Sequence, residues 1–220
     1  MKELRDKNNE MLQNEEILNK QKEELSKEKY LMDALMESVP EHIYFKDKDS
    51  KFIRFSKSML KLFGLSSDEE LAGKSDFDFF SAEHARPAFE DEQNIIHTGD
   101  RIIDKIEKET LNDGTVRWVN TSKLPLKDTD GNIVGTFGIS KNITHLKELE
   151  IEAEKKTEKI QALEAEIRTV KEETTDTGKD KTIKKLEKEL RNKSKELDRI
   201  REETEKTREQ IDELRRKNKK

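Results

Sequence analysis

Apolar residues in the C-terminal part of the chain recur with steps that alternate between three and four positions. From residue 146 they fall at Leu146, Leu149, Ala153, Ile160, Leu163, Ile167 and Val170, with Lys156 as a polar member of the series. Steps of this kind form a heptad seam, the pattern of helices that pack in a coiled coil. We therefore expect a helix over residues 146–173 and a homodimer formed through this stripe.

A second seam begins at residue 183 and is out of phase with the first. Its apolar members are Ile183, Leu186, Leu190, Leu197, Ile200, Ile211 and Leu214. Residues 174–181 separate the two seams and contain threonines, aspartates and a glycine, which are typical of a loop or a helix break. The pattern predicts a second coiled-coil helix over 182–220, stacked end to end on the first helix or folded against it as a hairpin.

The N-terminal segment, residues 1–37, is also rich in helix-forming residues, but only every seventh position is consistently apolar. These positions are Leu4, Met11, Leu18, Leu25 and Met32. The partner position of the heptad is polar until Leu35, and a stripe one residue wide makes a poor coiled coil. Two interpretations stay open: an N-terminal coiled coil, or a solvated helix that docks only through its apolar end.

Core-forming and turn-forming residues are concentrated between residues 38 and 145. All nine phenylalanines lie there, with the only tryptophan and all of the eight glycines except Gly178. Strand-like runs at 41–46, 51–55, 101–110, 115–126 and 132–141 are separated by turn signals such as Asn112-Asp113-Gly114. Short helical stretches fall between the second run and the third. This order predicts an α+β domain with a five-stranded antiparallel sheet.

The composition agrees with one modest domain beside long solvated helices. Charged residues make up 43% of the 220 residues and hydrophobic residues only 30%, too few for one core of this length. The 45 basic and 50 acidic residues leave a net charge of -5, so the chain has no excess of positive charge that would indicate nucleic-acid binding. No apolar stretch reaches the roughly 18 residues that cross a bilayer. We expect a cytoplasmic protein that binds neither nucleic acid nor a membrane.

Several stretches of the middle segment resemble PAS domains. The first strand and turn are matched by Ile43-Tyr44-Phe45-Lys46-Asp47, and the C-terminal PAS repeat, often called PAC, by Asp113-Gly114, Arg117-Trp118-Val119, Pro125-Leu126 and Asp130-Gly131. Asn142-Ile143-Thr144 stands where the family usually has Asp-Ile-Thr, at the exit to a signalling helix. The resemblance implies a PAS fold over residues 38–145, flanked by coiled coils. It also implies a signal hinge at Asn142, Ile143 and Thr144, without the usual aspartate charge.

The resemblance bears on cofactors. PAS photoreceptors hold flavin or coumarate covalently through cysteine, and the absence of cysteine excludes such an adduct here. Haem-binding PAS domains use a histidine in the middle of the long helix, where this chain has Ala88. Haem is therefore not expected. His84, at the start of that helix, is a candidate ligand contact, with an ordinary polar residue at a helix start as the alternative.

Strand alternation places Val119, Thr121 and Lys123 on one face of the strand over 115–126. Similarity to PAS domains implies that this face looks into a ligand pocket, joined by Ser140 from the last strand. A buried lysine is costly unless its charge is paired, and no acidic residue is obviously placed on the neighbouring strand. If the pocket binds a ligand, we expect a small anion. The alternative is a filled core from which Lys123 extends to the rim.

No catalytic signature accompanies these features. Glycine-rich phosphate loops are missing, and His145 lacks the sequence around a histidine-kinase phosphoacceptor. We expect a non-catalytic sensory and dimerisation module that passes a signal through its coiled-coil helices to a separate effector protein. The alternative is a structural coiled-coil adaptor with an empty PAS domain. Because family members usually carry the effector beyond such a coil, the output is another protein or the chain is truncated.

Overall fold

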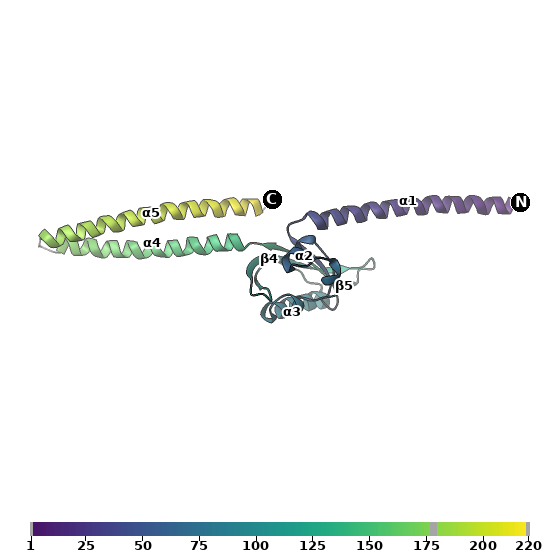
Figure 1. The fold of residues 1–220 in the computed structure, drawn as a ribbon, viewed down its shortest axis with the longest axis horizontal. Coiled ribbons are helices and arrows are strands. Elements are labelled where there is room, and N and C mark those ends of the chain that lie inside the picture. The colour runs from purple at the N-terminus through teal and green to yellow at the C-terminus, as the bar shows by residue number, and fades with distance from the viewer. Residues whose placement is uncertain (1, 177–179, 219–220) are drawn as a thin grey trace. The chain divides into compact units, whose positions relative to one another are not determined.

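The computed structural model describes residues 2–176 and 180–218, which form an α+β protein (Figure 1). Its elements are α1 (Lys2–Ser38), β1 (His42–Asp47), β2 (Phe52–Phe55), α2 (Lys57–Phe63), the short 3-10 helices η1 (Asp68–Glu70) and η2 (Asp76–Asp78), α3 (Ala82–Thr98), β3 (Ile102–Thr110), β4 (Val116–Lys127), β5 (Ile133–Asn142), α4 (Thr144–Asp176) and α5 (Asp180–Asn218). The chain divides into two compact units, residues 1–142 and residues 143–220.

The first unit is built on a five-stranded antiparallel sheet with the order β2-β1-β5-β4-β3. Strand alternation gives the sheet an inner face, where Val119, Thr121 and Lys123 of β4 are buried. Helix α3 contacts strands β3, β4 and β5 and buries its own residues Ala85, Ala88, Glu92 and Ile95. The fold class predicted from the sequence, α+β with a five-stranded antiparallel sheet, is confirmed.

Apolar residues at one side of the sheet fill the domain core. The main cluster is formed by Tyr44, Phe52, Met59, Leu60 and Leu71. Gly138 on β5 lies opposite Tyr44 on β1, and a Cβ atom at Gly138 would lie only 2.5 Å from the tyrosine ring. The strands can therefore pair here only because this position carries no side chain.

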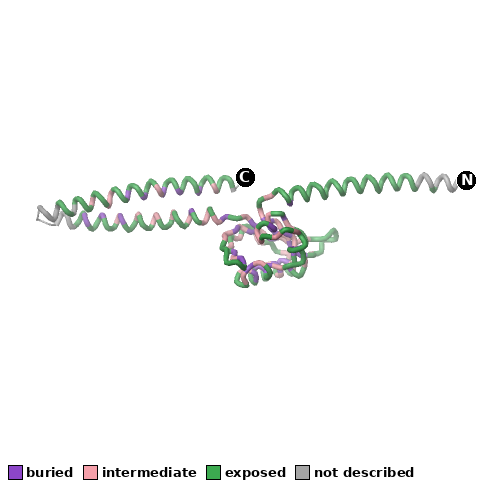
Figure 2. Tube along the Cα trace, in the orientation of Figure 1, coloured by how far each residue is buried: buried purple, intermediate pink, exposed green. Residues whose placement is uncertain are grey.

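Helix α1 contacts the rest of the first unit only near its C-terminal end. Figure 2 shows the described part of α1 as exposed along most of its length. Met11, Leu18 and Leu25 are 66%, 65% and 68% exposed, whereas Met36 is 5% exposed. Arg54 on β2 forms an ion pair of 2.7 Å with Asp33 beside this buried methionine. The side chain of Leu4 lies outside the described residues. Within this single chain, the described part of α1 is exposed except near its end. The two interpretations that the sequence left open, a coiled coil and a solvated helix, both stay predictions.

The second unit is a hairpin of two long helices. Leu163 and Ile167 of α4 pack with Leu197 and Ile200 of α5. Interhelical ion pairs join Glu150 to Arg215, Lys159 to Glu196 and Glu164 to Arg201, at distances of 3.0, 2.9 and 2.6 Å. Glu150, near the start of α4, pairs with Arg215 near the end of α5, whereas Glu164, further along α4, pairs with the earlier residue Arg201. The two helices therefore run antiparallel. Residues 177–179 of the predicted break lie outside the described residues.

The hairpin occupies the stripe that was predicted to form a dimer. Leu149, Leu163, Ile167 and Val170 are buried within the single chain, and Leu146, Ala153 and Ile160 are half-buried. The second seam, in α5, supplies an apolar partner in the same chain at high effective concentration. The homodimer through this stripe stays a prediction. Among the described residues, no helix combines the length and apolarity needed to cross a bilayer.

Candidate functional site

A small cavity lies inside the PAS-like unit, bounded by the inner face of the sheet and by α3. Its volume is about 30 Å³, measured as the space open to the centres of water-sized spheres. Four of the five residues predicted to contact a ligand line it: His84, Thr121, Lys123 and Ser140. Val119 is fully buried on the same strand face but does not line the cavity. Ligand binding by these residues stays a prediction.

Lys123 is not an unpaired charge. Its side chain is 3% exposed, and its Nζ lies 3.7 Å from Glu92 Oε1 and 3.9 Å from Asp91 Oδ2, both on α3. The ammonium also donates to the carbonyl oxygen of Ala88 at 3.2 Å. The expectation that Lys123 lacks an acidic partner, on which the anionic ligand was based, is therefore wrong. The carboxylates come from the helix that crosses the strand, not from a neighbouring strand.

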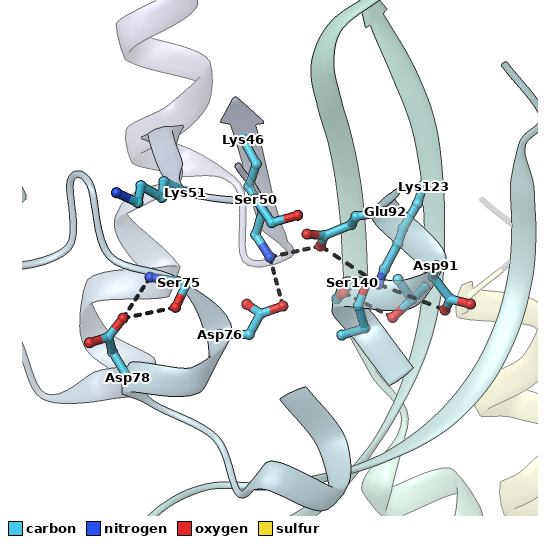
Figure 3. Close-up of polar contacts among 12 residues, drawn as sticks. Lys46, Ser50, Lys51, Ser75, Asp76, Asp78, Asp91, Glu92, Lys123 and Ser140 are labelled. Carbon is cyan, nitrogen blue, oxygen red and sulfur yellow. Dashed lines mark hydrogen bonds and ion pairs between the residues drawn. The ribbon is translucent and has the colours of Figure 1, made fainter. Parts of the chain in front are cut away.

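The sequence interpretation missed a second buried lysine beside the cavity. Lys46 on β1 is 1% exposed, and its Nζ donates to Asp76 Oδ2 and to Glu92 Oε1, each at 2.7 Å (Figure 3). Burial by itself would lower the pKa of Lys46, but the two carboxylate charges and their hydrogen bonds outweigh it, so the pKa is raised. Lys46 is therefore a permanent cation in the domain interior.

Glu92 connects the two buried lysines. Its Oε1 accepts from Lys46 at 2.7 Å and lies 3.7 Å from Lys123, while its Oε2 has no hydrogen-bond partner in the described part of the chain. One carboxylate thus links β1 and β4 to the middle of α3. A signal for this role exists in the sequence, because Ala85, Ala88, Glu92 and Ile95 follow helical spacing and place a carboxylate within an otherwise apolar stripe.

Two further carboxylates of the cavity wall are paired with cations. Glu109 accepts from Arg117 at 2.9 Å, and Glu107 forms an ion pair of 2.9 Å with Lys105. Burial raises the pKa of Glu109, and the neighbouring Arg117 only partly opposes that shift.

The neutral groups of the wall differ from the charged ones. His42 is 8% exposed and lines the cavity, yet its Nδ1 has no hydrogen-bond partner among the described residues. Burial, assisted by the charge of Arg117, lowers the pKa of His42 to about 4, so the imidazole is neutral at pH 7. Thr121 and Ser140 hydrogen-bond to each other at 2.9 Å. Burial, with the charges of Glu92 and Asp76, raises the pKa of Tyr44, which keeps its hydroxyl protonated.

The histidine predicted at the start of the long helix lies at the edge of this cavity. His84 occupies the first turn of α3, and its ring is 4.8 Å from that of Phe80. Ala88, in the middle of α3, is buried and offers its carbonyl to Lys123 instead of a haem ligand. Among the described residues, no group of three or more histidine or carboxylate side chains is arranged to hold a metal ion.

The predicted signal hinge falls at the boundary of the two units. Asn142 is the last residue of β5, and Thr144 is the first residue of α4. Ile143 lies between them and is 7% exposed, and its carbonyl accepts from the backbone N–H of Lys147. The chain therefore passes from strand to helix within a single residue. A role of this connection in signalling stays a prediction.

Comparisons with known proteins agree with this geometry. A family described as PAS fold matches residues 36–148. A methanogenesis regulatory histidine kinase, FilI, from Methanothrix harundinacea is 29% identical over 144 residues, which are 66% of this chain and 16% of that protein. A diguanylate cyclase from Vibrio cholerae is 24% identical over 120 residues, or 54% of this chain and 37% of the cyclase. The chain thus spans well under half of either relative.

Solved structures include a PAS domain from Colwellia psychrerythraea, 17% identical, with a TM-score of 0.45 over 53% of this chain and 97% of that one. The matched relatives are signalling proteins. The family match covers residues 36–148 of 220, and the sheet is five-stranded and antiparallel as expected. This chain therefore belongs to the PAS-fold family and carries a PAS sensory domain.

Proposed function

We propose that this chain is a non-catalytic sensory module in which the state of the PAS cavity biases the α4/α5 hairpin, and through it a separate effector protein. The observation that carries the proposal is the direct connection of β5, whose Ser140 lines the cavity, to α4 through the single residue Ile143. A change at Ser140 lies only a few residues from the first turn of the helix.

The packing of the hairpin suits this role. Helices that pack along a seam have discrete arrangements, so a small shift at one end favours one arrangement over another. The seam of this hairpin contains polar members: Thr204 and Thr207 are buried, and Lys156 Nζ donates to Thr207 Oγ1 at 3.0 Å. Polar seam residues lower the stability of a seam and fix its register, so the packing of these two helices is a defined arrangement and not one of a continuous series.

A cavity-filling substitution tests the proposal without knowledge of the ligand. Ala88 is buried and lines the cavity, so Ala88→Leu adds bulk where a ligand would add it. We expect altered hydrogen–deuterium exchange in α4, measured by mass spectrometry. Ala82→Leu, on the exposed first position of the same helix, is the matched control.

The structural adaptor remains the competing account, and the same experiment separates the two. If Ala88→Leu and Ala82→Leu give identical exchange in α4, and native mass spectrometry of the purified protein finds no retained small molecule, the sensory proposal fails. The PAS domain would then serve only as a rigid spacer.

A further inference from the structure

We propose that the PAS cavity of this chain binds a small molecule without net charge that both donates and accepts hydrogen bonds, as a primary amide does. The inference rests on the proposed sensory function and names the ligand class of that site. It replaces the anionic ligand that the sequence suggested.

The first argument is that every carboxylate and every lysine of the cavity wall already has a partner of opposite charge. Asp76 pairs with Lys46 at 2.7 Å, Glu107 with Lys105 at 2.9 Å and Glu109 with Arg117 at 2.9 Å. The fourth pair is that of Lys123 with Glu92, at 3.7 Å. An anion or a cation entering the cavity would lose its hydration and find no unpaired countercharge, which makes the binding of either unfavourable.

The second argument is that, among the residues that line the cavity, the unused hydrogen-bonding capacity belongs to neutral groups. The buried Nδ1 of His42 has no partner in the described part of the chain. Thr121 and Ser140 share one hydrogen bond, and Ser140 also interacts with the hydroxyl of Tyr44. The hydroxyl groups of Thr121, Ser140 and Tyr44 thus carry three protons and share two hydrogen bonds, so one proton and several lone pairs stay available to a ligand.

These groups specify a complementary ligand. A neutral imidazole offers one donor and one acceptor, and a chain of hydroxyls can turn either way. A molecule with a donor and an acceptor side by side would satisfy both, and leaving such groups buried without partners is unfavourable. A purely apolar molecule would not satisfy them.

Cavity size sets the scale of the ligand. A volume of about 30 Å³ open to water centres holds about two water molecules. Two waters occupy about 60 Å³ in the liquid, which corresponds to a compact molecule of about four non-hydrogen atoms. Such a ligand binds with a dissociation constant of roughly millimolar order. A larger ligand would first have to move α3 away from the sheet.

The test uses three probes of nearly identical shape and different charge: acetamide, acetate and acetamidinium. Each is titrated into the full-length 15N-labelled protein at constant ionic strength, and the backbone amide shifts of the PAS domain are followed by NMR. We expect saturable shifts around Thr121 and Ser140 with acetamide. Both charged probes should bind roughly tenfold or more weakly, because each would bury a charge that no residue of the cavity wall compensates.

A pair of variants ties binding to the cavity. Thr121→Val removes a hydroxyl from the wall and should weaken acetamide binding roughly fivefold, as the loss of one hydrogen bond does. Thr136→Val is the matched control, because Thr136 is also buried on the inner face but does not line the cavity. Equal effects of the two variants would contradict the assignment.

The outcomes separate this inference from the sensory proposal. Acetate or acetamidinium binding as tightly as acetamide, or no saturable shift with any of the three probes, would overturn the neutral-ligand inference. The sensory proposal would still stand if Ala88→Leu altered exchange in α4. Acetamide binding without any response of α4 would support the ligand class and count against the sensory proposal.

Discussion

Replacing Lys46 by methionine is expected to destabilise the PAS domain by more than any change of a surface charge. Methionine keeps most of the length of the side chain and removes its charge, which leaves Asp76 and Glu92 without the cation that lies 2.7 Å from each. Removing one partner of a buried ion pair costs about 3–5 kcal/mol, because the remaining charge is buried and uncompensated.

Two features place the expected loss at the lower end of that range. Lys123 lies 3.7 Å from Glu92 Oε1 and keeps part of the compensation, and the side chain of Asp76 is 11% exposed. A loss of about 3 kcal/mol is still a large part of the roughly 5–15 kcal/mol by which a domain is stable. For a domain of this size it lowers the melting temperature by roughly 12–24 °C.

The assay is urea denaturation of the full chain followed by tryptophan fluorescence. Trp118 is the only tryptophan, so its emission reports the PAS domain alone, whereas far-UV circular dichroism is dominated by the long helices. Lys105→Met is the control, because the Lys105 side chain is 38% exposed and its ion pairs contribute about 0–1 kcal/mol.

A loss of less than about 1 kcal/mol, or one equal to that of Lys105→Met, would refute the reasoning. The double variant Lys46→Met/Glu92→Leu extends the test. Replacing a buried ion pair by apolar residues of similar volume is often neutral, so part of the lost stability should return. A double variant less stable than Lys46→Met would mean that the loss of Glu92 as a partner of Lys123 outweighs the removal of the unpaired carboxylate.

Three further substitutions probe other features of the fold. His42→Asn should flatten the pH dependence of stability. The pKa of His42 falls from 6.5 to about 4 on folding, so the unfolded chain binds more protons than the folded chain between these two pH values. The wild type therefore loses on the order of 3 kcal/mol of stability as the pH falls from 6.5 to 4. Equal slopes in urea titrations of both proteins would contradict this. Gly138→Ala should cost about 1–3 kcal/mol by overpacking against Tyr44, whereas Gly131→Ala, at a φ of +86° in open space, should cost about 1 kcal/mol. A reversed order in the same fluorescence assay would be inconsistent with the packing. Leu163→Ala should destabilise the hairpin by about 2–5 kcal/mol, seen as an earlier loss of helical circular dichroism with the Trp118 transition unchanged. An unchanged dichroism transition would mean that Leu163 is not in the hairpin core.

Local patterns were enough to predict the strands and which residues share a face of β4, whereas the resemblance to PAS domains indicated which of its faces is buried. Thr121 and Lys123 alternate with outward residues on β4, and a period of two is a property of the strand itself. The heptad seams likewise specified which faces of α4 and α5 are apolar. Neither pattern depends on where other elements lie.

The charge network could not be predicted in the same way, because it depends on contacts between distant elements. Lys46 and Glu92 are 46 residues apart in the chain and meet only once α3 has crossed the sheet. The acidic partners of Lys123 likewise lie on α3, and not on a strand next to β4. The polar inner face of β1, with His42 and Lys46 buried, also reverses the usual rule that apolar residues face inward.

The choice between a hairpin and an end-to-end stack was equally beyond the seam pattern. Either arrangement buries the same apolar stripes, and the phase shift between the seams permits both. The antiparallel arrangement is favoured by pairs such as Glu164 with Arg201, whose charges match only when the chain turns back on itself.

The antiparallel return has a consequence for path length. Helix α4 has 33 residues, and at 1.5 Å per residue it spans about 50 Å. Yet Arg215, near the end of α5, bonds to Glu150 in the second turn of α4. A displacement of the first turns of α4 therefore reaches the last turns of α5 across one helix–helix spacing of about 8–10 Å, without travelling the length of either helix. In mechanical terms, the first turns of α4 and the last turns of α5 lie at the same end of the hairpin.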